Sequence, residues 1–268
     1  MNSDWSKPEN FRPISLLPSI SKVVERVIRH RLNTHLNDKN ILIPEQFGFR
    51  AQHSTLHQLL RVTEFVSENL NDNKPSAAVF LDVAKAFDKV WHTGLIYKLI
   101  TIGFPVRLIL LLHSYLSNRL FCVRINNILS DLRQITSGIL QGSVLGPTLF
   151  NIYFNDIPRN LFTNIALYAD DMCVYSAHNN LRFLNRHIQN HIDTILNWCL
   201  LWRVKINDTK CHAIFFSFKL PPPEFSSMLL SWSGKTIPRI LGSPWIGTSP
   251  TISTSAPSEE KPLLSIII

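Results

Sequence analysis

The chain of 268 residues is long enough to bury a large core, because 45% of its residues are hydrophobic and 10% are aromatic. These proportions exclude a disordered chain. Its 27 Lys and Arg residues exceed its 19 Asp and Glu residues, which gives a net charge of +8 spread along the sequence. A diffuse basic excess suits a polyanionic partner such as nucleic acid, although mildly basic proteins of other kinds are common.

The four cysteines show none of the spacings that indicate a metal site, which favours reduced thiols and an intracellular protein. The first thirteen residues lack the basic and apolar regions of a signal peptide. The most apolar later run, residues 95–116, is interrupted by Lys98, Pro105 and Arg107. We therefore expect neither a signal peptide nor a membrane span.

The first two predicted elements are helices. Residues 19–36 predict an amphipathic helix with a basic outer face. Its apolar positions are Ile20, Val23, Val24, Val27, Ile28 and Leu32, and its charged positions are Lys22, Glu25, Arg26, Arg29 and Arg31. After a glycine-containing linker at residues 46–54, a second helix is predicted through residues 56–70.

A short apolar run at residues 76–83 predicts a buried strand that ends in an acid, Asp82. Helical segments are expected in residues 84–120, with a break at the Gly-Phe-Pro of residues 103–105. The alternation in residues 120–138 then predicts strands around a turn at two asparagines.

An apolar helix is predicted at residues 148–157, after turn glycines. Residues 164–176 contain two short strand patterns around the sequence Ala-Asp-Asp, which predicts a hairpin. A helix at residues 181–202 and a further hairpin signal at Asn207 and Asp208 complete the ordered part. The sequence after Phe218 is rich in Pro, Ser and Thr without a sustained period, which is typical of a loose tail.

Acidic side chains end two of these strands. If the strands are neighbours in one sheet, Asp82 converges with Asp170 and Asp171 at one edge. Convergent carboxylates recruit Mg²⁺, and a pair of such ions serves phosphoryl transfer. An Asp-Asp pair at a hairpin is also a common solvated turn, because Asp favours turns. The pair alone therefore leaves both interpretations open.

Six segments, which include the two that carry these acids, resemble the reverse transcriptases of non-LTR retrotransposons, in particular the jockey-like elements of animals. The resemblance runs in order from about Pro8 to Phe218. The palm motifs are FLDVAKAFDKVWH (80–92), SGILQGSVLGPTLFNIYFNDIP (137–158), YADD (168–171) and WCLLWRVKINDTKCHAIFF (198–216), and the finger motifs are NFRPISLLPSISKVVERVIRHRL (10–32) and EQFGFRAQHST (45–55).

The resemblance implies an α+β right-hand polymerase whose antiparallel palm sheet packs on helices. Residues 1–218 would form the fingers and palm, with the fingers mainly in residues 1–75 and the palm motifs in residues 76–92 and 134–218. Residues 219–268 would be a degenerate Pro/Ser-rich tail, so that the thumb is missing or degenerate. No endonuclease motif precedes Asn10, so the chain resembles an excerpt of a longer polyprotein.

The resemblance also implies a role for each acid. Asp82 and Asp170 would hold two Mg²⁺ ions, with Mn²⁺ as an alternative, and the carbonyl of Val83 would add a ligand. Asp171 is the weaker candidate as a direct ligand, because consecutive strand side chains point to opposite faces. Lys210 matches the palm lysine that approaches the leaving pyrophosphate, although an exposed lysine is more often simply solvated.

Four residues match the nucleotide side of the family site. Phe87 matches an aromatic steric gate against the sugar 2′-hydroxyl, and a plain core phenylalanine is the alternative. Gln141, Gly142 and Ser143 match the loop that packs against the nucleotide and template, where Gly allows close backbone approach and Gln supplies an amide. A helix-start turn is the alternative for Gly142.

Two arginines lie in the finger motifs that face triphosphate or template backbone, Arg12 and Arg50, with solvated charges as the alternative. The sequence departs from the family at Leu140, where proline is usual. It departs again after Gly242, where no thumb pattern continues. We interpret the second departure as the product of a reading-frame shift or a splice event.

The expected function is RNA-directed DNA synthesis, with an RNA template, a DNA primer and deoxynucleotides as partners and no membrane. The resemblance implies a nuclear or cytoplasmic ribonucleoprotein. A decayed retroelement copy that binds nucleic acid without polymerising is one alternative. A basic helical binding module without a metal site is the other, and it requires the ordered motifs to be coincidental.

Overall fold

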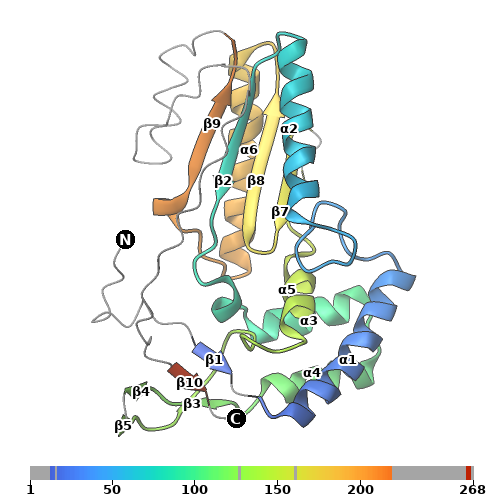
Figure 1. Ribbon diagram of the computed structural model, residues 1–268, viewed down its shortest axis with the longest axis vertical. Helices are drawn as coiled ribbons and strands as arrows, with labels where there is room; N and C mark the ends of the chain where they lie inside the picture. The colour runs from blue at the N-terminus through green and yellow to red at the C-terminus, as the bar shows by residue number, and fades with distance from the viewer. Residues whose placement is uncertain (1–12, 16, 126–127, 160–161, 219–263, 267–268) are drawn as a thin grey trace, which may run out of the picture.

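The computed structural model describes residues 13–15, 17–125, 128–159, 162–218 and 264–266. Its centre is an antiparallel sheet in the spatial order β7, β8, β2, β9 (Figure 1). These strands are β2 (Ser76–Leu81), β7 (Asn164–Tyr168), β8 (Asp171–Ala177) and β9 (His212–Phe216). The strand and the hairpin predicted from the apolar runs are confirmed, and so is the antiparallel palm sheet.

Helices cover both faces of this sheet. Because successive strand side chains alternate, each strand offers apolar residues to both sides. Helix α6 (Leu181–Leu201) packs on one face through four buried side chains at helical spacing, Leu184, Ile188, Ile192 and Ile195. On the other face, Val62 and Phe65 of α2 (Thr55–Asn71) pack on Ala78 and Tyr175. Both helices lie where the sequence predicts them.

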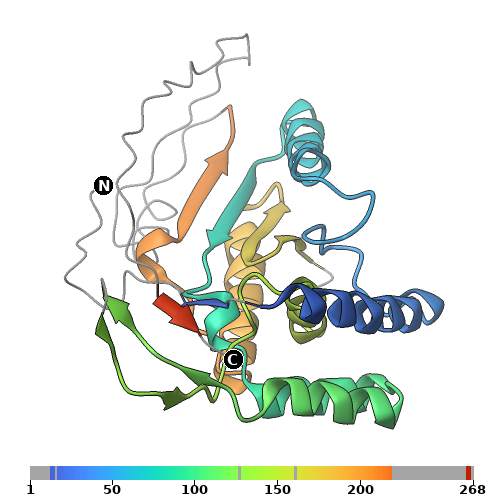
Figure 2. The same ribbon diagram turned by 60° about the horizontal axis from the view of Figure 1, so that its bottom comes forward.

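A second group of helices lies beyond one end of the sheet (Figures 1 and 2). Helix α5 (Gly146–Phe154) is central, and every side chain from Leu149 to Phe154 is buried. It contacts α1 (Ser19–Asp38) and α3 (His92–Ile102), and α3 contacts α4 (Val106–Leu116). The predicted break between α3 and α4 is confirmed, since Gly103 ends α3 with φ +81°.

The predicted orientation of α1 is partly wrong. Ile28 and Leu32 are buried as expected, together with Leu36, but Ile20, Val23, Val24 and Val27 are exposed. Glu25, predicted on the charged outer face, is 2% exposed. Its carboxylate accepts hydrogen bonds from the Tyr115 hydroxyl and the Val144 backbone N–H. These bonds offset the cost of burying an acid, so a different face of the helix turns inward.

Three two-stranded ladders contain the other described strands. Strand β3 (Leu120–Phe121) pairs with β6 (Arg133–Gln134), and β4 (Arg124–Ile125) pairs with β5 (Ile128–Leu129). The predicted turn at Asn126 and Asn127 lies outside the described residues, between β4 and β5. The third ladder is parallel and joins β1 (Pro13–Ser15) to β10 (Leu264–Ile266), which the sequence did not predict. The rest of the predicted tail lies outside the described residues.

The hairpin predicted at Asn207 and Asp208 is wrong. These residues lead into a short 3₁₀ turn, η3 (Asp208–Lys210). The segments on its two sides do not pair with each other: Ile206 bridges to Val83, and β9 pairs with β2. Both segments therefore lie in succession along β2 and its continuation.

Lys98 is a buried charge in the helical layer, 4% exposed. Its ammonium group donates to the carboxylate of Asp156 and to the backbone carbonyl of Tyr153, and it lies 3.8 Å from the ring centroid of Trp202. Burial lowers the pKa of Lys98 to about 8, and the bond to Asp156 opposes this shift.

No helix of the described residues is long and apolar enough to cross a membrane.

Candidate active site

Asp82 and Asp171 lie on neighbouring strands at the same end of the sheet. In the β2–β8 pairing Phe80 faces Cys173 and Leu81 faces Met172, so the next position places Asp82 opposite Asp171. By strand alternation both acids belong to the face that carries Phe80 and Cys173. The two strands are neighbours in one sheet, which was the condition for their acids to converge. In this register Asp171 is placed no less favourably than Asp170.

Asp170 occupies the turn of the hairpin. The last pair of the β7–β8 ladder is Tyr168 with Asp171, which leaves Ala169 and Asp170 as the two turn residues. Ala169 has φ +56°, a left-handed conformation that is uncommon for a residue with a Cβ atom. The chain therefore turns tightly enough to hold two consecutive acids beside the end of β2.

The three acids interact electrostatically. The pKa of Asp171 is raised, first by burial and then by the negative charges of Asp170 and Asp82, while Lys210 opposes the shift. The carboxylates of Asp170 and Asp82 thus make ionisation of Asp171 harder. A divalent cation at this position would remove that repulsion.

Asp82 already has two partners. Its Oδ2 atom lies 3.6 Å from Nζ of Lys210 and accepts a 3.0 Å hydrogen bond from Nδ2 of Asn207. Asn207 also donates its backbone N–H to the Asp82 carbonyl at 2.8 Å. Asn207 was not predicted as a site residue. Its only signal was a turn-forming Asn three residues before Lys210.

Val83 is buried and bridges to Ile206. The two hydrogen bonds of this bridge come from its flanking residues, Ala84 N–H to the Lys205 carbonyl and Asn207 N–H to the Asp82 carbonyl. In this antiparallel arrangement Val83 occupies a non-hydrogen-bonded position, so the bridge does not use its carbonyl. The role of that carbonyl as an oxygen ligand beside Asp82 stays a prediction.

The described residues contain no group of three or more His, Cys, Asp or Glu side chains arranged to hold a metal ion. Mg²⁺ is ordinarily bound by one or two carboxylates, with water and substrate phosphates supplying the other oxygens. The opposed pair of Asp82 and Asp171, with Asp170 next to it, fits that requirement. The donor set is all oxygen, which also suits a hard cation.

Phe87 lies in the 3₁₀ turn η2 (Ala86–Lys89), just beyond Asp82. It is half-buried, and its ring stacks on Phe150 with centroids 4.6 Å apart. The exposed ring of Phe49 meets it edge-on at 5.8 Å. The residue is therefore packed against the core on one side, and its role toward a sugar stays a prediction.

The loop of residues 141–143 is fixed by hydrogen bonds. Nε2 of Gln141 donates to Oδ1 of Asp88 at 2.6 Å, and Oγ of buried Ser143 accepts from the Gly146 N–H at the start of α5. Gly142 has φ +93°, a conformation that favours glycine, and it is exposed. Gly142 thus lies in a turn just before α5, where the Ser143 hydroxyl binds the first residue of the helix, and contact with nucleotide stays a prediction for all three.

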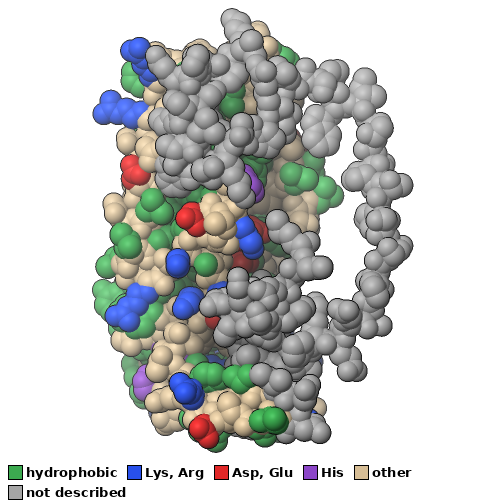
Figure 3. Space-filling view, turned by 90° about the vertical axis from the view of Figure 1, so that its left-hand side faces the viewer, with side chains coloured by type: hydrophobic (Ala, Val, Ile, Leu, Met, Phe, Trp, Pro, Cys, Tyr) green, Lys and Arg blue, Asp and Glu red, His purple; other side chains and the backbone are tan. Residues whose placement is uncertain are grey.

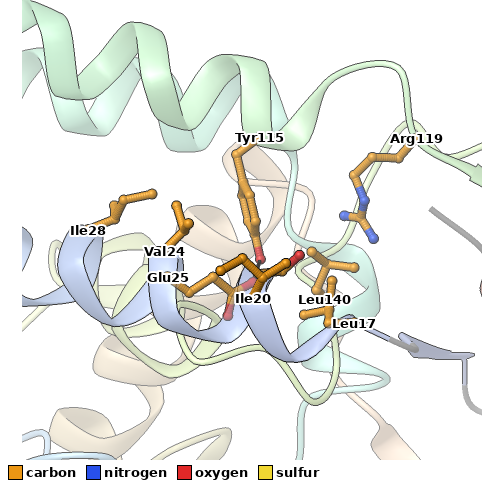
Figure 4. A pocket seen from close by; sticks show the side chains of 9 residues that line it. Leu17, Ile20, Val24, Glu25, Ile28, Tyr115, Arg119 and Leu140 are labelled. Carbon is orange, nitrogen blue, oxygen red and sulfur yellow. Dashed lines mark hydrogen bonds between the residues drawn. The ribbon is translucent and has the colours of Figure 1, made fainter.

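A cavity of about 280 Å³ lies beside this loop (Figure 4). Leu140, the position where the family usually has proline, lines it together with side chains from the start of α1. Figure 4 shows Tyr115 pointing toward Glu25, with Arg119 on the far side of the cavity. Glu25 accepts hydrogen bonds from the Tyr115 hydroxyl and from the Val144 N–H, so it links α4 to the residue that follows the loop.

The basic residues have different surroundings. Nη1 of half-buried Arg50 donates to the carbonyls of Ile43 and Gln46, at 2.8 and 3.2 Å, and burial lowers its pKa. Lys210 is exposed beside Asp82, and Arg12 lies outside the described residues. Figure 3 shows Lys and Arg side chains close to acidic ones in the middle of the face seen from the left of Figure 1.

Comparison with known proteins gives the family. The family described as "Reverse transcriptase (RNA-dependent DNA polymerase)" matches residues 3–244. The chain is 39% identical over 224 residues to the probable RNA-directed DNA polymerase from transposon BS of Drosophila melanogaster, covering 81% of this chain and 25% of that protein. It is 38% identical over 218 residues to the RNA-directed DNA polymerase from mobile element jockey of the same species, covering 78% and 24%. The chain thus spans about a quarter of the length of these relatives.

Solved structures give the fold. Apo telomerase from Candida tropicalis, truncated from the C-terminal domain, superposes with a TM-score of 0.54 at 15% identity, over 72% of this chain and 40% of that one. Telomerase from the same species in complex with an RNA fragment superposes equally well, over 74% and 34%. The sheet, the paired acids and the sequence match agree, and the chain belongs to the reverse transcriptase family.

Proposed function

We propose that this chain is the fingers and palm part of an RNA-directed DNA polymerase of a non-LTR retroelement. In the reaction, the 3′-hydroxyl of a primer attacks the α-phosphate of a deoxynucleoside triphosphate, and pyrophosphate leaves. The observation that carries the proposal is the pair of acids, Asp82 and Asp171, opposed on one face of adjacent strands, with Asp170 in the turn beside them. An opposed pair of carboxylates with a third acid in the adjacent turn, in a family of polymerases, supports nucleotidyl transfer rather than a solvated turn.

Asp82, Asp170, Asp171 and the Val83 carbonyl would hold two Mg²⁺ ions, or Mn²⁺ in their place. When bound, such ions offset the negative charge that develops on the reacting phosphate. Lys210 is an exposed side chain whose Nζ lies 3.6 Å from Oδ2 of Asp82, and this supports a role for its positive charge toward the leaving pyrophosphate. Asn207 holds the Asp82 carboxylate through its side-chain amide.

The nucleotide would lie between Phe87 and the loop of residues 141–143. The Phe87 ring cannot retreat easily, because Phe150 stacks behind it, so its bulk can oppose a 2′-hydroxyl. Arg50 uses only Nη1 in its two described bonds, and the other guanidinium donors can meet a phosphate of the template. We assign Arg12 the same kind of contact on its motif alone.

The partners would be an RNA template, a DNA primer and deoxynucleotides. The names of the Drosophila relatives and the RNA in the Candida telomerase complex support this choice. The basic excess suits a nucleic-acid backbone. A retroelement ribonucleoprotein would place the chain in the nucleus or the cytoplasm.

Primer extension on an RNA template tests the proposal. The purified chain should extend a DNA primer in a Mg²⁺-dependent manner, and Asp82→Asn should reduce extension at least about a hundredfold, because it removes a charge while keeping the shape. Asp193→Asn is the matched control, since Asp193 is an exposed acid on α6 that accepts a hydrogen bond from Gln189 of the same helix. Equal extension by parent and Asp82→Asn would contradict the assignment. RNA binding without extension by the parent would favour a retroelement-derived binding protein.

A further inference from the structure

The turn that carries Asp170 is held by a side chain from a distant loop. Gln46 is 2% exposed, and its Oε1 atom accepts the backbone N–H of Ala169 at 3.0 Å. Its Nε2 atom donates to the Ala169 carbonyl at 3.3 Å. One amide side chain therefore binds both backbone groups of the same turn residue.

The hairpin cannot satisfy these two groups itself. In a two-residue turn the last ladder pair is Tyr168 with Asp171, so the N–H and the carbonyl of Ala169 have no partner across the ladder. A primary amide offers one acceptor and one donor group, which matches them. The two bonds fix the peptide planes on both sides of Ala169, and the second of these planes ends at the nitrogen of Asp170.

The loop around Gln46 is itself braced. Residues 45–47 run parallel to β7, with the Leu167 N–H bonded to the Glu45 carbonyl and the Phe47 N–H bonded to the Leu167 carbonyl. Gly48 approaches the turn so closely that a Cβ atom there would lie 2.1 Å from the Ala169 nitrogen. Further bonds come from Arg50 to Ile43 and Gln46, from Gln58 to Glu45 and Leu167, and from Asn151 to Gly48.

We propose that Gln46 is a positioning residue of the active site. Its amide holds Ala169 in the left-handed conformation, and this sets the direction in which Asp170 leaves the turn toward Asp82. Replacing the amide loosens Asp170 and lowers the affinity of the acids for a divalent cation. The inference rests on the proposed function for its consequence in catalysis, but the positioning itself is measured without any polymerase assay.

Gln58 provides a matched control. It is also a buried amide, 7% exposed, and its Nε2 atom joins the same loop to β7 through the carbonyls of Glu45 and Leu167. No described bond links it to Ala169. The variants Gln46→Met and Gln58→Met therefore delete the same group from the same region. Only the first removes the two bonds to Ala169, and it also removes the acceptor of the Gly48 N–H.

Amide hydrogen exchange, followed by NMR, tests the bond directly. In the parent chain the Ala169 amide should be protected, although a turn amide in an isolated hairpin exchanges freely. Gln46→Met should speed its exchange at least about tenfold while Gln58→Met leaves it protected. If Gln46→Met does not melt cooperatively, the parent chain alone decides, because a freely exchanging Ala169 amide overturns the proposal.

Mn²⁺ binding to the metal-free chain, measured by electron paramagnetic resonance, tests the consequence. Gln46→Met should raise the Kd for Mn²⁺ about tenfold, since residues that orient metal ligands commonly contribute that much. Gln58→Met removes a brace of the loop but no bond to Ala169, so it should raise the Kd less than Gln46→Met does, and Asp82→Asn marks full loss of the site. Equal Kd values for the two Gln variants would overturn the inference. A parent chain that binds Mn²⁺ but does not extend primers would contradict the proposed function and leave the positioning role standing.

Discussion

The ring of Phe87 stacks on the ring of Phe150, with centroids 4.6 Å apart and planes inclined by 15°. Phe150 is fully buried in α5, whereas Phe87 is half-buried beside the loop of residues 141–143. A ring held from behind is more rigid than a side chain on an open surface. This makes Phe87 suited to discriminate by bulk.

Phe87→Val is expected to increase the use of ribonucleotides relative to deoxynucleotides at least about tenfold, because a smaller side chain leaves room for the 2′-hydroxyl. Competing single-nucleotide incorporation measures the ratio. Phe104→Val is the control, since Phe104 is a buried core residue that packs on His35 in the helical layer. An unchanged ratio in a Phe87→Val chain that still polymerises would mean that Phe87 is only a core residue and does not select the sugar.

Asp171→Asn is expected to raise the melting temperature of the metal-free chain at pH 7. Burial and the charges of Asp170 and Asp82 raise the pKa of Asp171 above its ordinary value of 3.8. A carboxyl whose pKa rises on folding stabilises the fold at a pH below its pKa in the unfolded chain. This contribution is lost as the pH rises through its pKa in the folded chain. The gain from Asn should therefore be present at pH 7 and vanish below pH 3.8, as calorimetry can show.

The same calorimetry should show that Mg²⁺ raises the melting temperature of the parent more than that of Asp171→Asn. Asp193→Asn removes an exposed acid and should leave both quantities unchanged. A gain that persists below pH 3.8, or one that the control shares, would mean that charge repulsion at the site is not its cause.

Lys98→Met tests the buried ammonium group of the helical layer. The folded-state pKa of about 8 lies below the ordinary value of 10.5, so the folded chain releases this proton more easily than the unfolded chain. Stability should therefore rise with pH between about 8 and 10.5, by up to about 3 kcal/mol. Urea unfolding of the parent and of Lys98→Met across this pH range gives the free energy of unfolding of each, and the difference between the two pH profiles is the contribution of Lys98. Parallel pH profiles would show that Lys98 is not responsible.

Two glycines should differ in their response to alanine. At Gly142 the nearest atom to an added Cβ is the Ser15 carbonyl oxygen, 3.7 Å away, so only the positive φ opposes alanine and the cost should be about 1 kcal/mol. At Gly48 the Cβ atom would lie 2.1 Å from the backbone of Ala169, and the chain must move. Chemical denaturation should show a larger loss for Gly48→Ala. Equal losses would contradict the close approach.

Elements with a strong period could be predicted from the sequence. The apolar run of β2 and the hairpin of β7 and β8 lie where their patterns place them, and the adjacency of β2 and β8 brings the acids together. Helix α6 was predicted to within a residue, because its buried side chains recur every three or four positions over 21 residues.

Features that depend on distant hydrogen bonds could not be predicted. Glu25 is buried because Tyr115 and Val144 bind its carboxylate. The hydrophobic pattern of a helix does not predict such partners. Asn207 has the composition of a turn residue, yet it holds Asp82, which lies 125 positions earlier. Polar contacts of this kind follow from how the helices and strands pack together. The sequence around one residue does not show which distant residue will bind it.

The bond between Gln46 and Ala169 also has a consequence for the order of folding. The two residues are 123 positions apart, so the chain between them must be closed into a loop before the bond can form. The hairpin of β7 and β8 is local and can form early, whereas the bond that aims its acid has to wait for α2, β2 and the helical layer to assemble. We therefore expect the geometry of this turn to be among the last features that the folding chain acquires, although its strands are among the first.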